Sequence, residues 1–358
     1  MRILYGVVGE GLGHAMRSQV ILDHLLSEDH EVEVMASGRA VDYLSQRFGS
    51  VNRIHGLHMI YEENRVRRGK TLASNISEAT TGVPRNIAAY FDLITKFQPE
   101  AVISDFESWT YLFAKTHGLP VLSVDNMQII NRASLPDEVI EGYEAEFELT
   151  KAFIKSKLPF CSEYFITTFF RPTLRKDRTS LFPPILRPEI LDAEREDGEH
   201  ILVYTTGEGN TAFASALAKT GIECRIYGMR RSITEEEREG NLRYMPFGKP
   251  GFIEDLATAR AVIGGGGFTL MGEAVYLHKP MLAVPLGYQF EQVLNARYLE
   301  LEGFGRFAPT LEDPATVFEF VEAIPGYREK LSSYSQDGNK EIFGGIDEWL
   351  DKAAAGLA

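Results

Sequence analysis

Four consecutive glycines at positions 264–267 restrict what this chain can fold into more than any other feature of the sequence. Residues 260–263 before them have the pattern of a short buried strand, and residues 268–277 after them have the pattern of a helix. A glycine turn between a strand and a helix directs several backbone N–H groups at one anion, and the missing Cβ atoms let a phosphate approach the main chain. The stretch therefore predicts a phosphate-binding turn, with a tight turn that binds nothing as the alternative.

The segment after the glycines adds a second strand and a polar loop. Residues 281–285 read as the strand, residues 288–292 carry tyrosine, glutamine and glutamate side chains, and a helix with Asn295 comes next. A diphosphate site that lies one strand–helix–strand unit away from a hydrogen-bonding loop indicates a pocket for a nucleotide sugar.

Length, charge and cysteine content limit the class of protein. A chain of 358 residues is too long for one ordinary hydrophobic core, so two domains are expected. The net charge of -14 argues against nucleic-acid binding, which needs a positive face. The two cysteines, Cys161 and Cys224, fit a reducing cytoplasm with neither a disulfide framework nor a zinc site. The apolar run at residues 3–8 is too short for a signal peptide or a membrane span, so we expect a cytoplasmic protein.

The first half of the chain predicts a parallel sheet. An apolar strand at residues 3–8, a helix at 15–27 and an alternating strand at 30–36 make a strand–helix–strand unit, which is typical of a doubly wound α/β domain. The turn at 9–13 has the spacing Gly-x-Gly-x-Gly, and the dinucleotide-binding fingerprint would need a glycine where His14 stands. An NAD-type site is therefore disfavoured.

His14 is the strongest candidate for a catalytic base. It follows the first strand at the start of a helix, where open α/β sheets place their ligands, and the positive helix end keeps an imidazole neutral and able to accept a proton. The strand at residues 102–106 carries Asp105 to the same edge of the sheet, so this carboxylate is expected to orient the imidazole. Arg17 lies one helical turn below His14. A helix-capping role is the alternative for both His14 and Asp105.

A proline-rich segment divides the chain. Prolines cluster over residues 172–188, which marks a linker and places a domain boundary near residue 190. The second half opens with a strand at 200–204 and a small-residue turn at 205–211 before a helix. This turn is a second candidate for contact with a phosphate.

Three other stretches have recognisable patterns. Residues 135–157 read as one long, mostly acidic helical stretch, and residues 164–170 read as a strand rich in aromatic and branched side chains. Residues 64–70 are basic in an acidic protein. This basic stretch is either a solvated loop or a contact for an anionic acceptor or lipid headgroups.

Together these residues resemble a glycosyltransferase of the GT-B architecture, in the MurG-like and UDP-glucuronosyltransferase-like group. The resemblance covers essentially the whole chain and is strongest over residues 252–303. The run 264–295 is similar to the plant-type donor signature, with its glycine-rich turn, Glu273, two prolines, an acid–glutamine pair and an asparagine. The acid is Glu291, where that signature often has aspartate, and this departure leaves the donor sugar open.

The motif at residues 9–17 also resembles the same group of transferases. The Gly-x-Gly-x-Gly-His run followed by Arg17 resembles the acceptor loop of related transferases. Its glycine order differs from that of the MurG-type loop, so a peptidoglycan acceptor is not implied. The resemblance implies two Rossmann-like, doubly wound parallel-sheet domains that face each other across a cleft. They would be an acceptor-binding domain at residues 1–189 and a nucleotide-sugar-binding domain at 190–335, with a C-terminal helix at 336–358 packing back on the first.

The resemblance also implies roles for individual residues. The donor would be contacted by Gly207, Gly209, Asn210, Phe252, Ile253, Gly265, Gly266, Gly267, Phe268, Glu273, Gln289, Glu291 and Gln292. Within this set the glycine amides would bind the diphosphate, the residues at 252 and 253 the base, Glu273 both ribose hydroxyls, and the polar side chains at 289–292 the sugar. The acceptor side would be formed by Gly11, Gly13, Arg17 and Asn126. His14 would deprotonate the acceptor hydroxyl, oriented by Asp105.

The implied activity is transfer of a hexose from a nucleotide-diphosphate donor, a UDP sugar in the first instance, to an acceptor hydroxyl. Inversion of the anomeric carbon and a role in cell-envelope or glycoconjugate synthesis are expected. GT-B enzymes as a group need no metal, so neither a metal nor a cofactor is expected beyond the co-substrate. A lipid-linked acceptor is one option and would bring the protein to the inner face of the membrane, with peripheral contact at most. A hydrolase or 2-epimerase of the same architecture and a non-catalytic nucleotide-sugar-binding protein are the alternatives.

Overall fold

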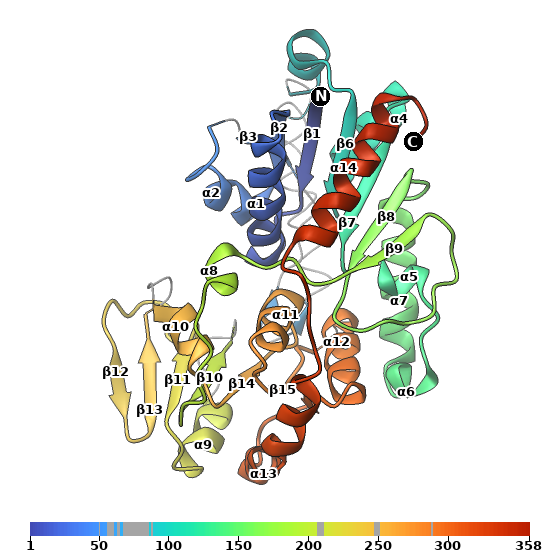
Figure 1. Cartoon of the computed structure of the whole chain (residues 1–358). Helices are drawn as coiled ribbons and strands as arrows, with labels where there is room; N and C mark the ends of the chain where they lie inside the picture. Colours follow the sequence, from blue (N-terminus) through green and yellow to red (C-terminus); the bar gives the residue numbers. More distant parts are fainter. Residues whose placement is uncertain are drawn as a thin grey trace.

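The computed structural model of the chain describes residues 1–49, 51–55, 61–62, 65–66, 86, 89–205, 211–246, 251–287 and 289–358. Two α/β domains, each built on a seven-stranded sheet, stand one above the other in Figure 1. Strands in the first sheet pair in parallel, and in the second sheet only the edge strand β12 is antiparallel to its neighbour. The predicted fold class, two Rossmann-like domains with parallel sheets, is confirmed.

The first sheet has the strand order β3-β2-β1-β6-β7-β8-β9. The strand order reverses between β1 and β6, and in doubly wound sheets this position is where ligands bind. Its central strands are buried and mostly aliphatic, as expected when helices cover both faces. The strands are β1 (Arg2–Val7), β2 (Glu31–Ala36), β3 (Val51–Arg53), β6 (Ala101–Asp105), β7 (Val121–Asp125), β8 (Glu163–Thr167) and β9 (Thr179–Phe182).

Helices connect these strands, and a small antiparallel pair, β4 (Tyr61–Glu62) and β5 (Arg65–Val66), stands apart from the sheet. The stretch at 135–157 does not form the single helix expected of it. It forms two, because Gly142 between them has a φ of 78°, which an α-helix does not accommodate. The helices are α1 (Leu12–Ser27), α2 (Gly38–Leu44), the π-helix η1 (Leu93–Phe97), α4 (Ser108–His117), α5 (Ile129–Arg132), α6 (Asp137–Ile140) and α7 (Glu144–Lys157).

The second sheet has the order β12-β13-β11-β10-β14-β15-β16, so its strand order reverses between β10 and β14. Its strands are β10 (Ile201–Tyr204), β11 (Cys224–Tyr227), β12 (Glu237–Glu239), β13 (Leu242–Met245), β14 (Ala261–Gly264), β15 (Met281–Ala283) and β16 (Gly305–Phe307). The accompanying helices are α8 (Pro188–Leu191), α9 (Thr211–Lys219), α10 (Gly251–Ala257), α11 (Phe268–Tyr276), α12 (Phe290–Leu301) and α13 (Pro314–Leu331).

Aromatic side chains join the two domains. The strand expected at 164–170 ends at Thr167, because the two phenylalanines that follow pack against the second domain instead of continuing the sheet. Phe170 stacks on Tyr298 of α12 with ring centroids 3.7 Å apart, and Phe169 lies 6.2 Å from Phe268 of α11. One cluster of buried hydrophobic residues therefore extends through both domains.

The chain returns to the first domain at its C-terminus. After α13 in the lower domain, α14 (Lys340–Ala354) lies along the upper domain in Figure 1. Ile346 and Trp349 are buried in the same core as β1, and His24 of α1 stacks on Phe343 at 4.1 Å. This contact ties the second domain to the outer face of the first.

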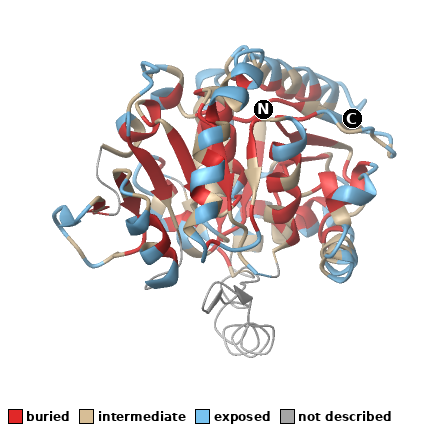
Figure 2. Cartoon of the chain, turned by 90° about the horizontal axis from the view of Figure 1, so that it is seen from below, coloured by how far each residue is buried: buried red, intermediate tan, exposed pale blue. Residues whose placement is uncertain are grey.

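The distribution of buried residues follows the packing of helices on the two sheets. Figure 2 shows buried residues concentrated in the strands and on the inward faces of the helices, with exposed residues on the outside. Within the described ranges, no helix is both long and apolar enough to cross a bilayer.

Candidate active site

The predicted base and its partner lie where the strand order of the first sheet reverses. β1 and β6 are neighbours, and Val7 pairs with Asp105 in their register. α1 begins at Leu12 soon after β1, and Gly11 before it has a φ of 81°, which suits glycine. His14 in the first turn of α1 is thereby brought to the end of β6. Both residues stand at the edge where open α/β sheets bind ligands.

Asp105 is the centre of a buried hydrogen-bond network. Its side chain is 1% exposed, and its Oδ1 lies 2.7 Å from Nδ1 of His14. Arg17 donates to Oδ2 from Nε at 2.8 Å and to Oδ1 from Nη2 at 2.5 Å, and Ser18 donates to Oδ2 at 2.9 Å. Burial alone would raise the pKa of the Asp105 carboxyl, but Arg17 and His14 outweigh it and hold this pKa well below its usual range. The carboxylate therefore stays ionised.

The proton on His14 is determined by these neighbours. Nδ1 lies 2.7 Å from the Asp105 carboxylate and 2.6 Å from Nη2 of Arg17, and it can donate to the first or accept from the second. Because Arg17 already donates to Asp105 and a charge-assisted bond to a carboxylate is the stronger one, Nδ1 carries the proton. The lone pair is then on Nε2, and the imidazole is the more exposed member of the pair, at 14%. This tautomer can accept a proton from a bound group.

The glycine turn of the second domain lies against the N-terminal end of α1, which carries His14. It runs from the end of β14 into α11, with Gly267 as the N-cap of α11 and Gly266 at a φ of 81°. A Cβ on Gly266 would lie 2.8 Å from the carbonyl oxygen of Gln292, so the turn packs directly on α12. A Cβ on Gly13 of α1 would lie 2.6 Å from Oγ1 of Thr269 in α11. The N-termini of α1 and α11 therefore touch, and two positive helix ends face one region.

Glu273 of α11 has a partner that the sequence pattern did not indicate. Its side chain is 2% exposed, and its two oxygens accept from Nε and Nη2 of Arg187 at 2.7 and 2.8 Å. Arg187 lies in the proline-rich segment between the domains and is the N-cap of α8. A ribose that reached Glu273 would therefore have to share the carboxylate with Arg187.

The polar residues expected in a loop at 288–292 make contacts on both sides of the domain boundary, but α12 begins at Phe290, so Glu291 and Gln292 lie in its first turn. Glu291 accepts a hydrogen bond from Asn126 of the first domain, with its Oε1 2.8 Å from Nδ2. Gln292 accepts from the backbone N–H of Leu286 at 3.0 Å and donates to the side chain of Gln289. Asn126 in turn accepts from Nη1 of Arg17 at 2.9 Å. A chain of hydrogen bonds thus runs from His14 in α1 to the first turn of α12 in the second domain.

The remaining predicted residues are placed in part. Phe252 and Ile253 are half-buried in α10, where the Phe252 ring packs edge-on against Tyr227 with centroids 4.9 Å apart. The residues predicted to close over the diphosphate, Gly207, Gly209 and Asn210, lie outside the described residues. Of the basic stretch, only residues 65–66 are described, as β5.

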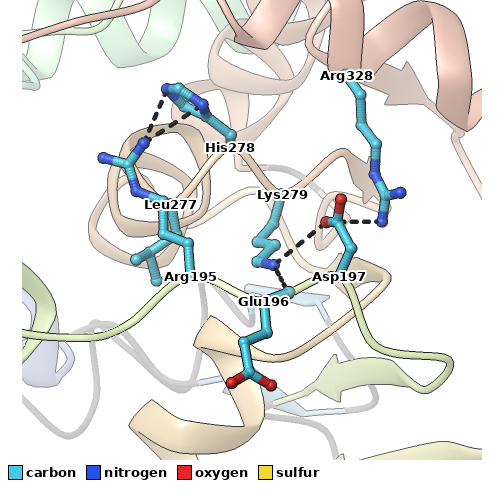
Figure 3. A pocket seen from close by; sticks show the side chains of 7 residues that line it. All are labelled: Arg195, Glu196, Asp197, Leu277, His278, Lys279 and Arg328. Atoms are coloured by element: carbon cyan, nitrogen blue, oxygen red, sulfur yellow. Dashed lines mark hydrogen bonds and ion pairs between the residues drawn. The ribbon is translucent and has the colours of Figure 1, made fainter.

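A separate hollow of about 250 Å³ lies at the opposite end of α11. In Figure 3, Lys279 points at the carbonyl of Glu196 and at Asp197, and Arg328 points at Asp197 from the other side, 3.0 Å away. Burial lowers the pKa of Lys279 to about 8. These contacts fasten the segment after α8 to the end of α11 and to α13. The hollow is lined by Arg195, Glu196, Asp197, Leu277, His278, Lys279 and Arg328.

Solved structures share this two-domain architecture. The calicheamicin glycosyltransferase CalG4 aligns with a TM-score of 0.68 at 15% identity, covering 98% of this chain and 99% of that one. UGT2 of Phytolacca americana, complexed with UDP-2fluoro-glucose and pterostilbene, aligns with a TM-score of 0.65 at 13% identity, covering 99% and 100%. At these identities the likeness is one of fold. Two facing Rossmann-like domains with glycine turns at both switch points make up the GT-B fold, which this chain shares with these structures.

The family follows from the sequence itself. A family model described as Glycosyl transferase family 1 matches residues 1–325, and the chain therefore belongs to that family. An uncharacterized glycosyltransferase of Methanosarcina acetivorans is 24% identical over 397 residues, covering 99% of this chain and 100% of the relative. The protein is thus an enzyme of the glycosyltransferase type, and the resemblance read from its glycine turns is confirmed.

Proposed function

We propose that this glycosyltransferase moves a sugar from a UDP-sugar donor to an acceptor hydroxyl, with inversion of the anomeric carbon and without a metal ion or cofactor. One observation supports the proposal above all. His14, bonded to Asp105, stands at the N-terminus of α1, and this helix end touches the N-terminus of α11 through Gly13 and Thr269. A proton acceptor and two positive helix ends from different domains therefore meet, which is the combination that displacement at a sugar diphosphate requires.

The departing diphosphate would be stabilised by main chain. The bond between the anomeric carbon and the diphosphate oxygen breaks with its electron pair on the diphosphate, so negative charge grows there. The backbone N–H groups of Gly265, Gly266, Gly267 and Phe268 and the positive end of α11 would stabilise that charge. The missing Cβ atoms give the diphosphate room to approach them.

The acceptor hydroxyl would be activated by His14. As the acceptor oxygen forms its bond to the anomeric carbon, its proton passes to Nε2 of His14. Asp105 then faces an imidazolium through the bond at 2.7 Å, and it stays a carboxylate because Arg17 lowers its pKa. General-base help of this kind contributes roughly 10²–10⁴-fold. A single displacement from the side opposite the leaving group inverts the configuration.

The other donor contacts stay proposals of the same kind. Phe252 and Ile253 would hold the nucleobase of the donor. Glu273 would accept the ribose hydroxyls while it shares its carboxylate with Arg187. Gly207, Gly209 and Asn210 would close over the diphosphate, and Gln289, Glu291 and Gln292 would bond the sugar. UDP is favoured as the nucleotide because UGT2 is complexed with UDP-2fluoro-glucose.

The acceptor side would be shaped by Gly11, Gly13, Arg17 and Asn126. Arg17 and Asn126 are 5% and 3% exposed, so they would support the acceptor region from beneath rather than present polar groups to it. The acceptor itself would be a hydroxyl compound of cell-envelope or glycoconjugate synthesis. If it is lipid-linked, the enzyme works against the inner face of a membrane.

A melting-temperature screen against UDP, dTDP, GDP and CMP sugars tests the donor, since a ligand that binds the native state raises the midpoint. The nucleotide sugar that binds is then incubated with and without hydroxyl acceptors, and the products are followed by mass spectrometry and anomeric NMR. We expect a glycoside of inverted configuration that forms only with acceptor. Free sugar or a 2-epimer in its absence would identify a hydrolase or an epimerase, and a sugar-nucleotide complex that never turns over would identify a binding protein.

A further inference from the structure

The amide of Asn126 connects the network around Asp105 in the first domain with the first turn of α12 in the second. Asn126 follows β7 and is 3% exposed. Its Oδ1 accepts from Nη1 of Arg17 at 2.9 Å, and its Nδ2 donates to Oε1 of Glu291 at 2.8 Å. A buried amide with both ends engaged by charged groups has a fixed orientation, because rotating it by 180° would set donor against donor and acceptor against acceptor.

Glu291 has a second carboxylate oxygen, Oε2, beside the one that Asn126 engages. It lies in the first turn of α12, where the helix dipole favours a carboxylate, and its Oε1 is taken by Asn126. Among the residues that the structure describes, none donates a hydrogen bond to its Oε2. An ionised carboxylate oxygen with free lone pairs accepts a hydroxyl well, and sugars supply hydroxyls.

The length of the side chain matters for this bridge. An aspartate at 291 would be one methylene shorter, by roughly 1.5 Å, and a hydrogen bond of 2.8 Å does not stretch that far. Glutamate, in place of the aspartate frequent at this position of the donor signature, is therefore the residue that reaches Asn126 across the domain boundary.

We propose that Asn126 is a positioning residue for the donor sugar: it fixes Oε1 of Glu291 so that Oε2 accepts a sugar hydroxyl, and donor recognition is completed by the acceptor domain. This deepens the proposed transferase function and rests on it. Since Asn126 is also bonded to Arg17, and Arg17 to Asp105, the same amide ties the sugar site to the network that orients the base. The amide thereby fixes the position of the donor sugar relative to His14.

Calorimetric titration with UDP-glucose and with UDP distinguishes positioning of the donor sugar from a purely structural role of Asn126. The variants are Asn126→Ala, Asn126→Asp, Glu291→Ala and Glu291→Asp, together with the double variant of the two alanines. Asn126→Asp keeps an acceptor for Arg17 but cannot donate to Glu291. Loss of a hydrogen bond to a charged group predicts UDP-glucose affinity about 10–150-fold weaker, with UDP affinity unchanged. The double variant is expected to bind no more weakly than Glu291→Ala alone.

Asn131→Ala is the matched control, because it removes another buried amide, 2.6 Å from Nζ of Lys176, from the same part of the first domain without touching Glu291. Equal losses for UDP and UDP-glucose in Asn126→Asp, or additive losses in the double variant, would overturn the proposal and leave Asn126 a link between domains. If UDP-glucose does not bind the unmodified enzyme, the nucleotide sugar found by the melting screen replaces it. An enzyme that binds no nucleotide sugar at all would instead contradict the proposed function.

Discussion

Replacing Asp105 by asparagine changes charge and one hydrogen-bonding atom while keeping the shape of the side chain. Oδ1 accepts from His14 and Arg17, and Oδ2 accepts from Arg17 and Ser18. Asparagine has one oxygen and one NH2 group, so in either orientation its NH2 faces an N–H of Arg17. In the orientation with NH2 toward His14, Nδ1 becomes an acceptor and the ring proton moves to Nε2. In both orientations the imidazolium formed during transfer loses its counter-charge.

The expected loss has two parts. We expect the rate constant for nucleoside diphosphate release, measured on folded protein with saturating substrates, to fall about 10²–10⁴-fold, the range that a general base supplies. Arg17 is 5% exposed and would be left without its counter-charge, so the free energy of unfolding in urea should fall by about 3–5 kcal/mol. Calorimetric affinity for UDP is the control and should be unchanged. A rate within about tenfold of the unmodified enzyme would refute the assignment of the base.

Three further predictions use the same assays. His14→Ala should cut turnover by more than about a hundredfold while UDP still binds, and unchanged turnover would remove His14 from the mechanism. Glu273→Ala should weaken UDP affinity and, because Arg187 loses both of its bonds to that carboxylate, lower the free energy of unfolding by about 3–5 kcal/mol; equal UDP affinity by calorimetry would exclude the ribose role. The pKa of Asp105 is lower in the folded than in the unfolded chain, so its stabilisation is complete above about pH 3.9 and is lost as the pH falls from there through the folded pKa. The urea midpoint of Asp105→Asn should therefore fall less between pH 5 and pH 3 than that of the unmodified enzyme, and parallel losses would contradict the shift.

The fold was predictable because its signals are local. Buried strands, glycine turns and helices alternate in both halves, and that alternation predicts a parallel sheet in each half. Three local readings were wrong. α12 begins at Phe290, inside the loop expected at 288–292. Gly142 divides the helix expected at 135–157, and Phe169 and Phe170 leave the strand to pack against the second domain.

The sequence predicted only those contacts of the site that follow from neighbouring strand ends. Asp105 and His14 follow neighbouring strands, so their approach could be expected from topology. Three contacts of the site join residues that are far apart in the sequence. These are Ser18 with Asp105, 87 positions apart, Arg187 with Glu273, 86 apart, and Asn126 with Glu291, 165 apart. No periodicity or motif encodes such pairs, because they depend on how the domains and helices pack. The roles of all these residues stay predictions until variants are measured.

A crystal structure with UDP bound tests the central claim most directly. We predict the diphosphate within about 2.7–3.2 Å of the backbone N–H groups of Gly267 and Phe268, with the imidazole of His14 facing the terminal phosphate across the two helix ends. A diphosphate bound elsewhere, for example among Arg195, Lys279 and Arg328 at the opposite end of α11, would contradict the account.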